Sequence, residues 1–151
     1  RPIRMDAKNK KYFSRYMDIP NEPLFPFGYG LSYSEFEYSD LQVLTPEVEL
    51  GGEVKISVKV TNKGKYDGDD VVQLYVHDVV AETTRPVREL KGFERVELRA
   101  GEERTIEFTI TPEDMSFWTI NEEFAQEPGT FHVWVGHDSN AKLDGEFKVC
   151  K

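Results

Sequence analysis

Carboxylates and serines are the side chains of this sequence most able to do chemistry. The chain carries 28 Asp and Glu residues, but acid–base hydrolysis needs two of them converging across a cleft in different environments. Their spacing instead puts most of them on strand exteriors and in turns. No serine lies in a Gly-x-Ser-x-Gly elbow or beside an evident base, and "GYGLSYS" is not such an elbow. The residues therefore predict no catalytic site.

Aspartates and histidines are the candidates for holding a metal ion. Three aspartates cluster in "YDGDD" and are Asp67, Asp69 and Asp70. They suggest a calcium loop, but the residue order of an EF-type loop is not met, so a polar hairpin turn is the simpler interpretation. The histidines are His77, His132 and His137. None pairs at i, i+4 on a helix or neighbours a cysteine, so we expect no metal and no other cofactor.

Length and charge limit the class of protein. With 151 residues the chain suffices for one domain with its own core. A formal net charge of −9 argues against a nucleic-acid partner, which needs a clustered basic face. The sequence has no long apolar run for a membrane span, and "RPIRMDAKNKKYF" lacks the apolar stretch of a signal peptide. A single cysteine, Cys150, excludes an internal disulfide. The missing initial Met suggests a fragment or a processed chain.

Strand periodicity dominates the sequence from residue 36 onward. In "EVKISVKVT" at 53–61, alternate apolar residues point to one face of a half-buried strand. The same alternation appears in "FEYSDLQVL", "VVQLYVHD", "LKGFERVEL", "RTIEFTIT", "TFHVWVGH" and "GEFKVC". The seven strands are expected to start near residues 36, 53, 71, 91, 104, 130 and 145. Turns rich in Gly and Pro separate them, and no helical period interrupts them.

Seven short strands with one apolar face each predict an all-β sandwich of the fibronectin type III (immunoglobulin-like) kind. In that topology the third and sixth strands lie side by side. Both are also apolar on their second face, which carries Val71 and Tyr75 on the third strand and Trp134, with His132, on the sixth. We therefore expect something to cover Tyr75 and Trp134.

Residues 1–35 are the candidate for that cover. They hold six Lys and Arg against four Asp and Glu, and seven of the 19 aromatic residues, which is too apolar for a solvated linker. In "PLFPFGYGLSY" at 23–33, two prolines favour an extended, kinked course. Its glycines do not form a dinucleotide-binding loop, because Tyr33 stands where a third glycine is needed. We predict an ordered strap over 1–35 and a sandwich over 36–151.

A second group of aromatic residues lies in "EDMSFWTINEEF" at 113–124. This stretch has no clean period, and we expect a long loop at one end of the sandwich, where binding sites often lie. Phe117 and Trp118 could offer flat faces to the apolar side of a sugar ring. The alternative is that these aromatic residues belong to the core or to an interface.

Four stretches together resemble a known family. They are "RYMDIPNEPLFPFGYGLSYSEFEYSDL", "TNKGKYDGDDVVQLYVHD", "TRPVRELKGFERVELRAGE" and "FTITPEDMSFW". Their order and spacing are similar to those in the C-terminal region of family 3 glycoside hydrolases, especially bacterial β-glucosidases, and the resemblance covers Arg1 to Cys150. It implies a non-catalytic fibronectin type III-like domain, joined by the strap to an α/β sandwich domain that itself follows a (β/α)₈ barrel.

The resemblance further implies that the domain stabilises those catalytic domains by packing against them. The residues expected at the contact are Phe25, Phe27, Tyr29, Tyr33, Tyr75 and Trp134. The family's nucleophile is an aspartate in a Ser-Asp-Trp context, whereas "YSDL" at 38–41 has leucine in place of the tryptophan. No catalytic residue carries over, and the chain alone is expected to be inert. The parent would hydrolyse terminal β-D-glucosyl residues with retention.

Other expectations stay open at this point. The alternative function is a carbohydrate-binding module that holds β-glucan near the active site through Trp118 or Trp134, and a third is an independent enzyme. An uncovered aromatic patch on a lone domain would also permit a homodimer. Bacterial members of the family are commonly exported, which implies a periplasmic or secreted location.

Overall fold

The computed structural model describes residues 3–5, 12–14, 23–79 and 85–151. The strands of the body are β3 (Phe36–Val43), β4 (Glu47–Glu49), β5 (Val54–Asn62), β6 (Gly68–Asp78), β7 (Glu89–Leu98), β8 (Glu103–Ile110), β9 (Phe117–Trp118), β10 (Phe124–Ala125), β11 (Gly129–Gly136) and β12 (Leu143–Cys150). Near the N-terminus, β1 (Ile3–Met5) and β2 (Tyr12–Ser14) pair antiparallel with each other. Within the strap predicted over 1–35, most of residues 1–22 lie outside the described residues.

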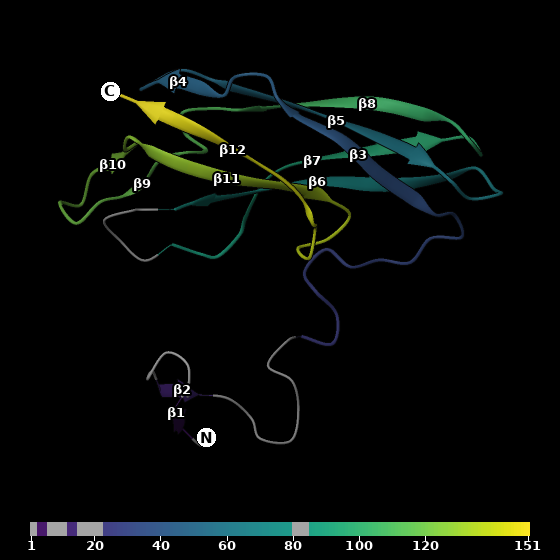
Figure 1. Cartoon of the computed structure of the whole chain (residues 1–151), viewed down its shortest axis with the longest axis horizontal. Helices are drawn as coiled ribbons and strands as arrows, with labels where there is room; N and C mark the ends of the chain where they lie inside the picture. The colour runs from purple at the N-terminus through teal and green to yellow at the C-terminus, as the bar shows by residue number, and fades with distance from the viewer. Residues whose placement is uncertain (1–2, 6–11, 15–22, 80–84) are drawn as a thin grey trace.

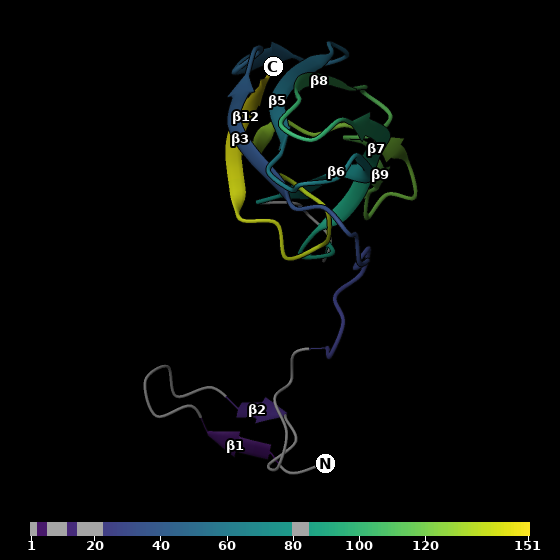
Figure 2. The same cartoon turned by 90° about the vertical axis from the view of Figure 1, so that its right-hand side faces the viewer.

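Two sheets form the body and face one another (Figure 1). One has three strands in the order β3-β5-β8, and the other has five in the order β4-β12-β11-β6-β7. Figure 2 shows the two layers from the side, with the chain leading into β3 running down from them. This is the predicted fibronectin type III-like sandwich, in which seven long strands and the short β4 make the two sheets. The strand number was underestimated, because the body has ten strands once the short β4, β9 and β10 are included.

The core lies between the sheets and follows from the alternation in the sequence. Every second residue of β5, from Val54 to Val60, is fully buried. The facing strands supply buried Val, Leu and Phe side chains, and Phe131 of β11 stacks on Phe147 of β12 with ring centroids 5.1 Å apart and planes 2° from parallel. In the described part of the chain, no helix is long and apolar enough to cross a membrane.

The stretch that contains "YDGDD" crosses from one sheet to the other. It leaves β5 in the three-stranded sheet and enters β6 in the five-stranded sheet, so the predicted hairpin turn is wrong. The buried Asn62 stabilises this crossing, because its Nδ2 donates to the carbonyls of Tyr66 (2.9 Å) and Leu98 (3.1 Å) and its Oδ1 accepts from the amide of Gly64 (2.9 Å).

The predicted long loop at 113–124 contains a hairpin instead. Strands β9 and β10 pair antiparallel, with Phe124 opposite Trp118 and Ala125 opposite Phe117. Two-residue strands are too short to leave a period in the sequence, which is why the pattern at 113–124 gave no strand signal. The hairpin projects from one end of the sandwich (Figure 1).

Candidate functional site

The outer face of the five-stranded sheet is where the strap meets the body. Strands β6 and β11 are neighbours, as predicted, and Trp134 lies directly opposite Tyr75. Tyr75 is only 2% exposed even though its side chain points away from the core. The strap supplies the cover, because the hydroxyl of Tyr75 lies 3.5 Å from the carbonyl oxygen of Phe27.

Backbone groups of the strap make the attachment. The carbonyl of Phe27 accepts a 2.8 Å hydrogen bond from the amide of Ser139, in the loop between β11 and β12. Gln73 joins the same two segments, since its Nε2 donates to the carbonyls of His137 (2.6 Å) and Gly28 (3.4 Å). Its Oε1 accepts from the hydroxyl of Tyr75 at 2.5 Å. The strap is therefore held mainly through main-chain atoms rather than through its aromatic rings.

Gly28 is required where the strap touches the sheet. Its φ of +82° lies in the left-handed region, which side chains with a Cβ rarely adopt. A Cβ at this position would also come within 2.7 Å of Nε2 of Gln73. The close approach of strap and sheet thus depends on the missing side chain.

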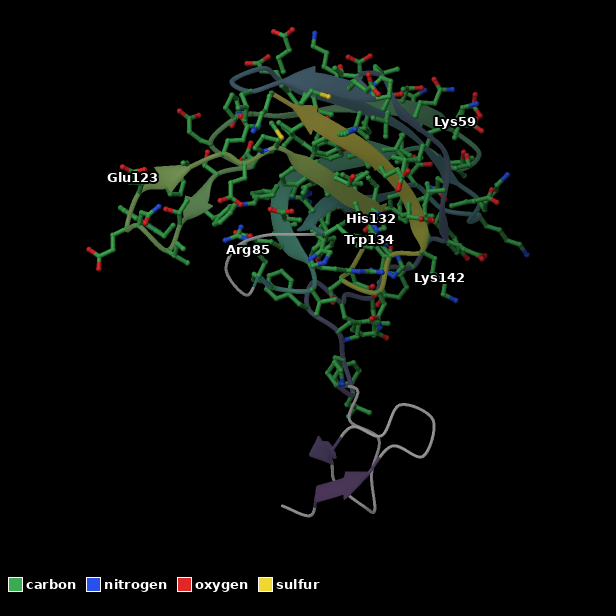
Figure 3. The ribbon with its side chains drawn as sticks, turned by 60° about the vertical axis from the view of Figure 1, so that its left-hand side comes forward. Lys59, Arg85, Glu123, His132, Trp134 and Lys142 are labelled. Carbon is green, nitrogen blue, oxygen red and sulfur yellow. The ribbon has the colours of Figure 1, made fainter. Side chains whose placement is uncertain are left out.

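Arg88 holds the loop to which the strap is attached. Its Nη1 donates to the carbonyls of Ser139 and Ala141, both at 2.7 Å, and its guanidinium carbon lies 4.2 Å from the ring centroid of Trp134. Such stacking of a guanidinium on an indole is a favourable cation–π contact. Figure 3 shows Trp134 and His132 on the side of the sandwich from which the strap extends. Arg88, the loop and the strap therefore form one connected unit.

The tyrosines beside the attachment stay protonated. Burial raises the pKa of Tyr38, and its 2.6 Å hydrogen bond to Oδ2 of Asp70 raises that pKa further. Burial and the carboxylate of Asp138 also raise the pKa of Tyr75, while Arg88 acts in the opposite direction. Raised values keep both hydroxyls neutral, so Tyr75 can donate to Gln73 throughout the physiological pH range.

The large apolar side chains of the strap, by contrast, are left exposed by the body. Leu24 is 88% exposed and Tyr33 is 100% exposed. Phe25 and Phe27 are also exposed by more than half, and Phe25 lies beside the partly exposed Tyr29 with ring centroids 5.1 Å apart. A run of large apolar side chains is thus held in place and left uncovered by the described part of the chain.

Two of the residues predicted to contact other molecules are buried instead. Tyr75 is covered by the strap of its own chain and cannot meet another domain directly. Phe117 is 2% exposed, because the hairpin turns its ring toward the sandwich, so it cannot stack on a sugar. Trp118, on the other face of the hairpin, is 66% exposed. Neither outcome could be read from the sequence, since it depends on how the strap and the hairpin lie against the sheets.

The sequence also gave no sign of several residues at these places. Gln73 reads as an ordinary polar position in a strand, and Gly28 as one of many loop glycines. Arg88 lies in "TRPVREL", a stretch that resembles the family, but the sequence indicates no particular role for it. Phe124 lies opposite Trp118 only because of the hairpin pairing.

The aspartates and histidines do not converge on a site. Oδ1 of Asp67 accepts from the amide of Ala100, Asp69 pairs with Arg95, and Asp70 accepts from the Tyr38 hydroxyl. Each histidine likewise has its own polar partner. His77 lies next to the carbonyl of Pro86, His132 next to Glu146 and His137 next to Asp138. Within the described ranges, no three His, Cys, Asp or Glu residues are grouped to hold a metal ion.

Gly28→Ala is expected to loosen the strap. The left-handed φ costs an alanine about 1–2 kcal/mol, which corresponds to about a five- to thirtyfold larger open fraction. The amide of Ser139, which donates to the strap, should then exchange its hydrogen faster by a similar factor in native-state hydrogen exchange. Gly30→Ala is the matched control, because a Cβ there meets nothing within 4 Å. Equal exchange in the two variants would show that Gly28 does not hold the strap.

Comparison with known proteins identifies a matching family model and similar curated proteins. A family model described as a fibronectin type III-like domain matches residues 70–139. Among curated proteins, the chain is 45% identical over 149 residues to a periplasmic β-glucosidase of Salmonella typhimurium, covering 99% of this chain and 19% of that protein. It is 40% identical over 138 residues to a β-xylosidase-like protein of Formosa agariphila, covering 91% of this chain and 18% of that protein. The chain thus spans about a fifth of these relatives.

Solved structures agree with this assignment. A β-glucosidase of Listeria innocua, solved with glucose, superposes with a TM-score of 0.87 at 45% identity, over 95% of this chain and 20% of that one. A family 3 (GH3) β-glucosidase of Bifidobacterium adolescentis gives a TM-score of 0.75 at 31% identity, over 82% of this chain and 18% of that one. The chain is a fibronectin type III-like domain, and it belongs with those of the family 3 β-glucosidases.

Proposed function

We propose that the chain is the non-catalytic accessory domain of a longer family 3 glycoside hydrolase and stabilises the catalytic domains by packing against them. The observation that supports the proposal is that the strap is bound to the body while its large apolar side chains stay exposed. Its backbone is bound to the five-stranded sheet at Phe27 and Gly28, while Leu24, Phe25 and Tyr33 project outward and stay largely exposed. A segment that only linked two domains would not need to hold apolar side chains in this way.

The expected contact is large enough to matter for stability. Interdomain interfaces bury roughly 600–1,500 Å². Burial contributes about 25 cal/mol per Å² of apolar area before ordering costs are subtracted, so a half-apolar interface is worth several kcal/mol. Five of the six predicted contact residues remain in the proposal after the burial of Tyr75. They are Phe25, Phe27, Tyr29, Tyr33 and Trp134.

The longer parent enzyme would determine the partner domains, the catalytic activity and the cellular location. The partners would be the barrel and α/β sandwich domains of the same polypeptide, with the boundary between strap and sandwich after residue 35. Relatives named as β-glucosidases support hydrolysis of terminal β-D-glucosyl residues as the parent's activity. Retention of configuration is what the resemblance to the family implies. One relative is named as periplasmic, which supports a periplasmic or secreted location.

Removing the domain tests the proposal. In the longer protein, truncation at residue 22 should lower the Tm while leaving the chemical step unchanged, so turnover measured well below the Tm should be retained. The isolated 151-residue chain should release no chromophore from an aryl β-glucoside. An unchanged Tm in the truncated protein would contradict a stabilising role, and hydrolysis by the isolated chain would contradict a non-catalytic one.

A further inference from the structure

The β9–β10 hairpin carries an aromatic pair that the packing proposal does not use. Trp118 is 66% exposed and Phe124 is 53% exposed, and they lie directly opposite each other in the pairing. Their ring centroids are 5.7 Å apart, with planes inclined by 56°. The two rings therefore form one continuous aromatic surface on the outer face of the hairpin.

The base of the hairpin is firmly attached. Phe117, on the inner face, is buried, and the guanidinium carbon of Arg85 lies 4.9 Å from its ring centroid. Figure 3 shows Arg85 at the base of the hairpin. Gln126, which follows β10, accepts a 2.9 Å hydrogen bond from the amide of Gly51. Because the hairpin is held at its base, a ligand on the outer face would find the rings already ordered, which lowers the cost of binding.

The turn of the hairpin and the residue after β10 supply carboxylates and an amide close to the rings in the sequence. Asn121, Glu122 and Glu123 form the turn of the hairpin, and Glu127 follows β10. Figure 3 shows Glu123 at the far end of the hairpin, pointing away from the body. No Lys or Arg occurs anywhere from residue 105 to residue 141, so no cation of the hairpin neutralises these carboxylates.

Exposed aromatic rings beside uncompensated carboxylates favour a sugar over a protein as the partner of the hairpin. A protein surface that covered the hairpin would have to desolvate several carboxylates, which is unfavourable unless it brought matching cations. A sugar avoids that cost, because its hydroxyls donate to carboxylates that remain charged and partly hydrated. The apolar face of a pyranose meanwhile packs on an aromatic ring.

We propose that Trp118 and Phe124, with the acidic turn beside them, form a binding site for a β-linked glucose oligomer. The choice of β-linked glucose rests on the proposed function, in which the parent acts on β-glucosides. The ring face of Trp118 takes one glucose unit, Phe124 borders it, and the carboxylates of the turn accept hydrogen bonds from its hydroxyls. The site lies on the hairpin and shares no residue with the strap.

The test uses the chain itself and NMR, because a readout from Trp118 fluorescence would vanish with the residue. In a ¹H–¹⁵N titration with cellotetraose and, separately, laminaritetraose, the indole N–H of Trp118 and the hairpin amides should shift saturably with at least one of them. The chain has only two tryptophans, so the indole N–H of Trp134 serves as an internal control and should stay unshifted. Maltotetraose, which is α-linked, should bind more weakly.

Variants separate stacking from general apolar contact. Trp118→Ala should abolish the amide shifts, and Phe124→Ala should weaken binding by up to about tenfold, since an aromatic contact is worth about 0.5–1.5 kcal/mol. Ile120→Ala, which removes another exposed apolar side chain of the same hairpin, should leave sugar binding unchanged.

Unshifted or non-saturating spectra with every β-linked sugar would overturn the proposal. So would shifts that depend on protein concentration alone and disappear in Trp118→Ala, because they would assign the hairpin to a second copy of the chain. Since the strap is untouched, neither result bears on the packing proposal.

Discussion

Phe147→Ala is expected to lower the free energy of unfolding of the chain by about 3–5 kcal/mol, the usual cost of removing a buried phenylalanine. Phe147 is 1% exposed and stacks on Phe131 between the two sheets. Alanine would leave a cavity next to that ring which neighbouring strands, fixed by their hydrogen bonds, can fill only partly. Denaturant unfolding, followed by circular dichroism, measures the change.

Phe93→Ala provides the control for this result. Phe93 belongs to the same five-stranded sheet but is 71% exposed. Its truncation should change the free energy of unfolding by no more than about 0.5 kcal/mol. Similar losses for the two variants would mean that the stacked pair does not lie in the core of the sandwich.

The paired change Phe25→Ala with Phe27→Ala is expected to leave the stability of the isolated chain nearly unchanged and to destabilise the longer enzyme. In the isolated chain both rings are largely exposed, so stability should change by no more than about 0.5 kcal/mol. In the longer enzyme the same rings would be buried, and their loss should remove about 3–6 kcal/mol of contact energy, at about 1.5–3 kcal/mol for each ring. Thermal unfolding of all four proteins measures this difference.

Leu50→Ala is the matched control for the paired change. Leu50 is also a partly exposed apolar residue, but it follows β4, far along the chain from the strap. It should have little effect on the Tm in either setting. Equal effects of the Phe25 and Phe27 substitutions in the isolated chain and in the longer enzyme would argue against burial by other domains.

The sandwich could be predicted from the sequence because its strands are long and half-buried. From β3 onward, the alternation of apolar and polar residues follows the two sides of each long strand, and it identified seven strands and the neighbouring positions of β6 and β11. The prediction that something covers the outer face beside Tyr75 also followed from this pattern, and the cover is the strap.

The attachments could not be predicted, because they join residues distant in sequence through main-chain atoms. Gln73 and Gly28 are 45 residues apart, and the carbonyl of Gly28 carries no sequence signal. The β9–β10 hairpin could not be predicted for a different reason. Its two-residue strands leave no periodic pattern in the sequence, so the sequence did not show which of Phe117 and Trp118 lies on the inner face. Nor could the sequence show that Tyr75 is fully covered by its own chain.

We claim that neighbouring domains, rather than this chain, bury the apolar side chains of the strap. Hydroxyl-radical footprinting with mass spectrometry measures this directly, comparing the isolated chain with the longer enzyme. We expect Phe25, Phe27 and Tyr33 to be oxidised readily in the isolated chain and strongly protected in the longer enzyme, while Leu50 should react equally in both. Equal oxidation of the three strap residues in the two proteins would contradict the claim.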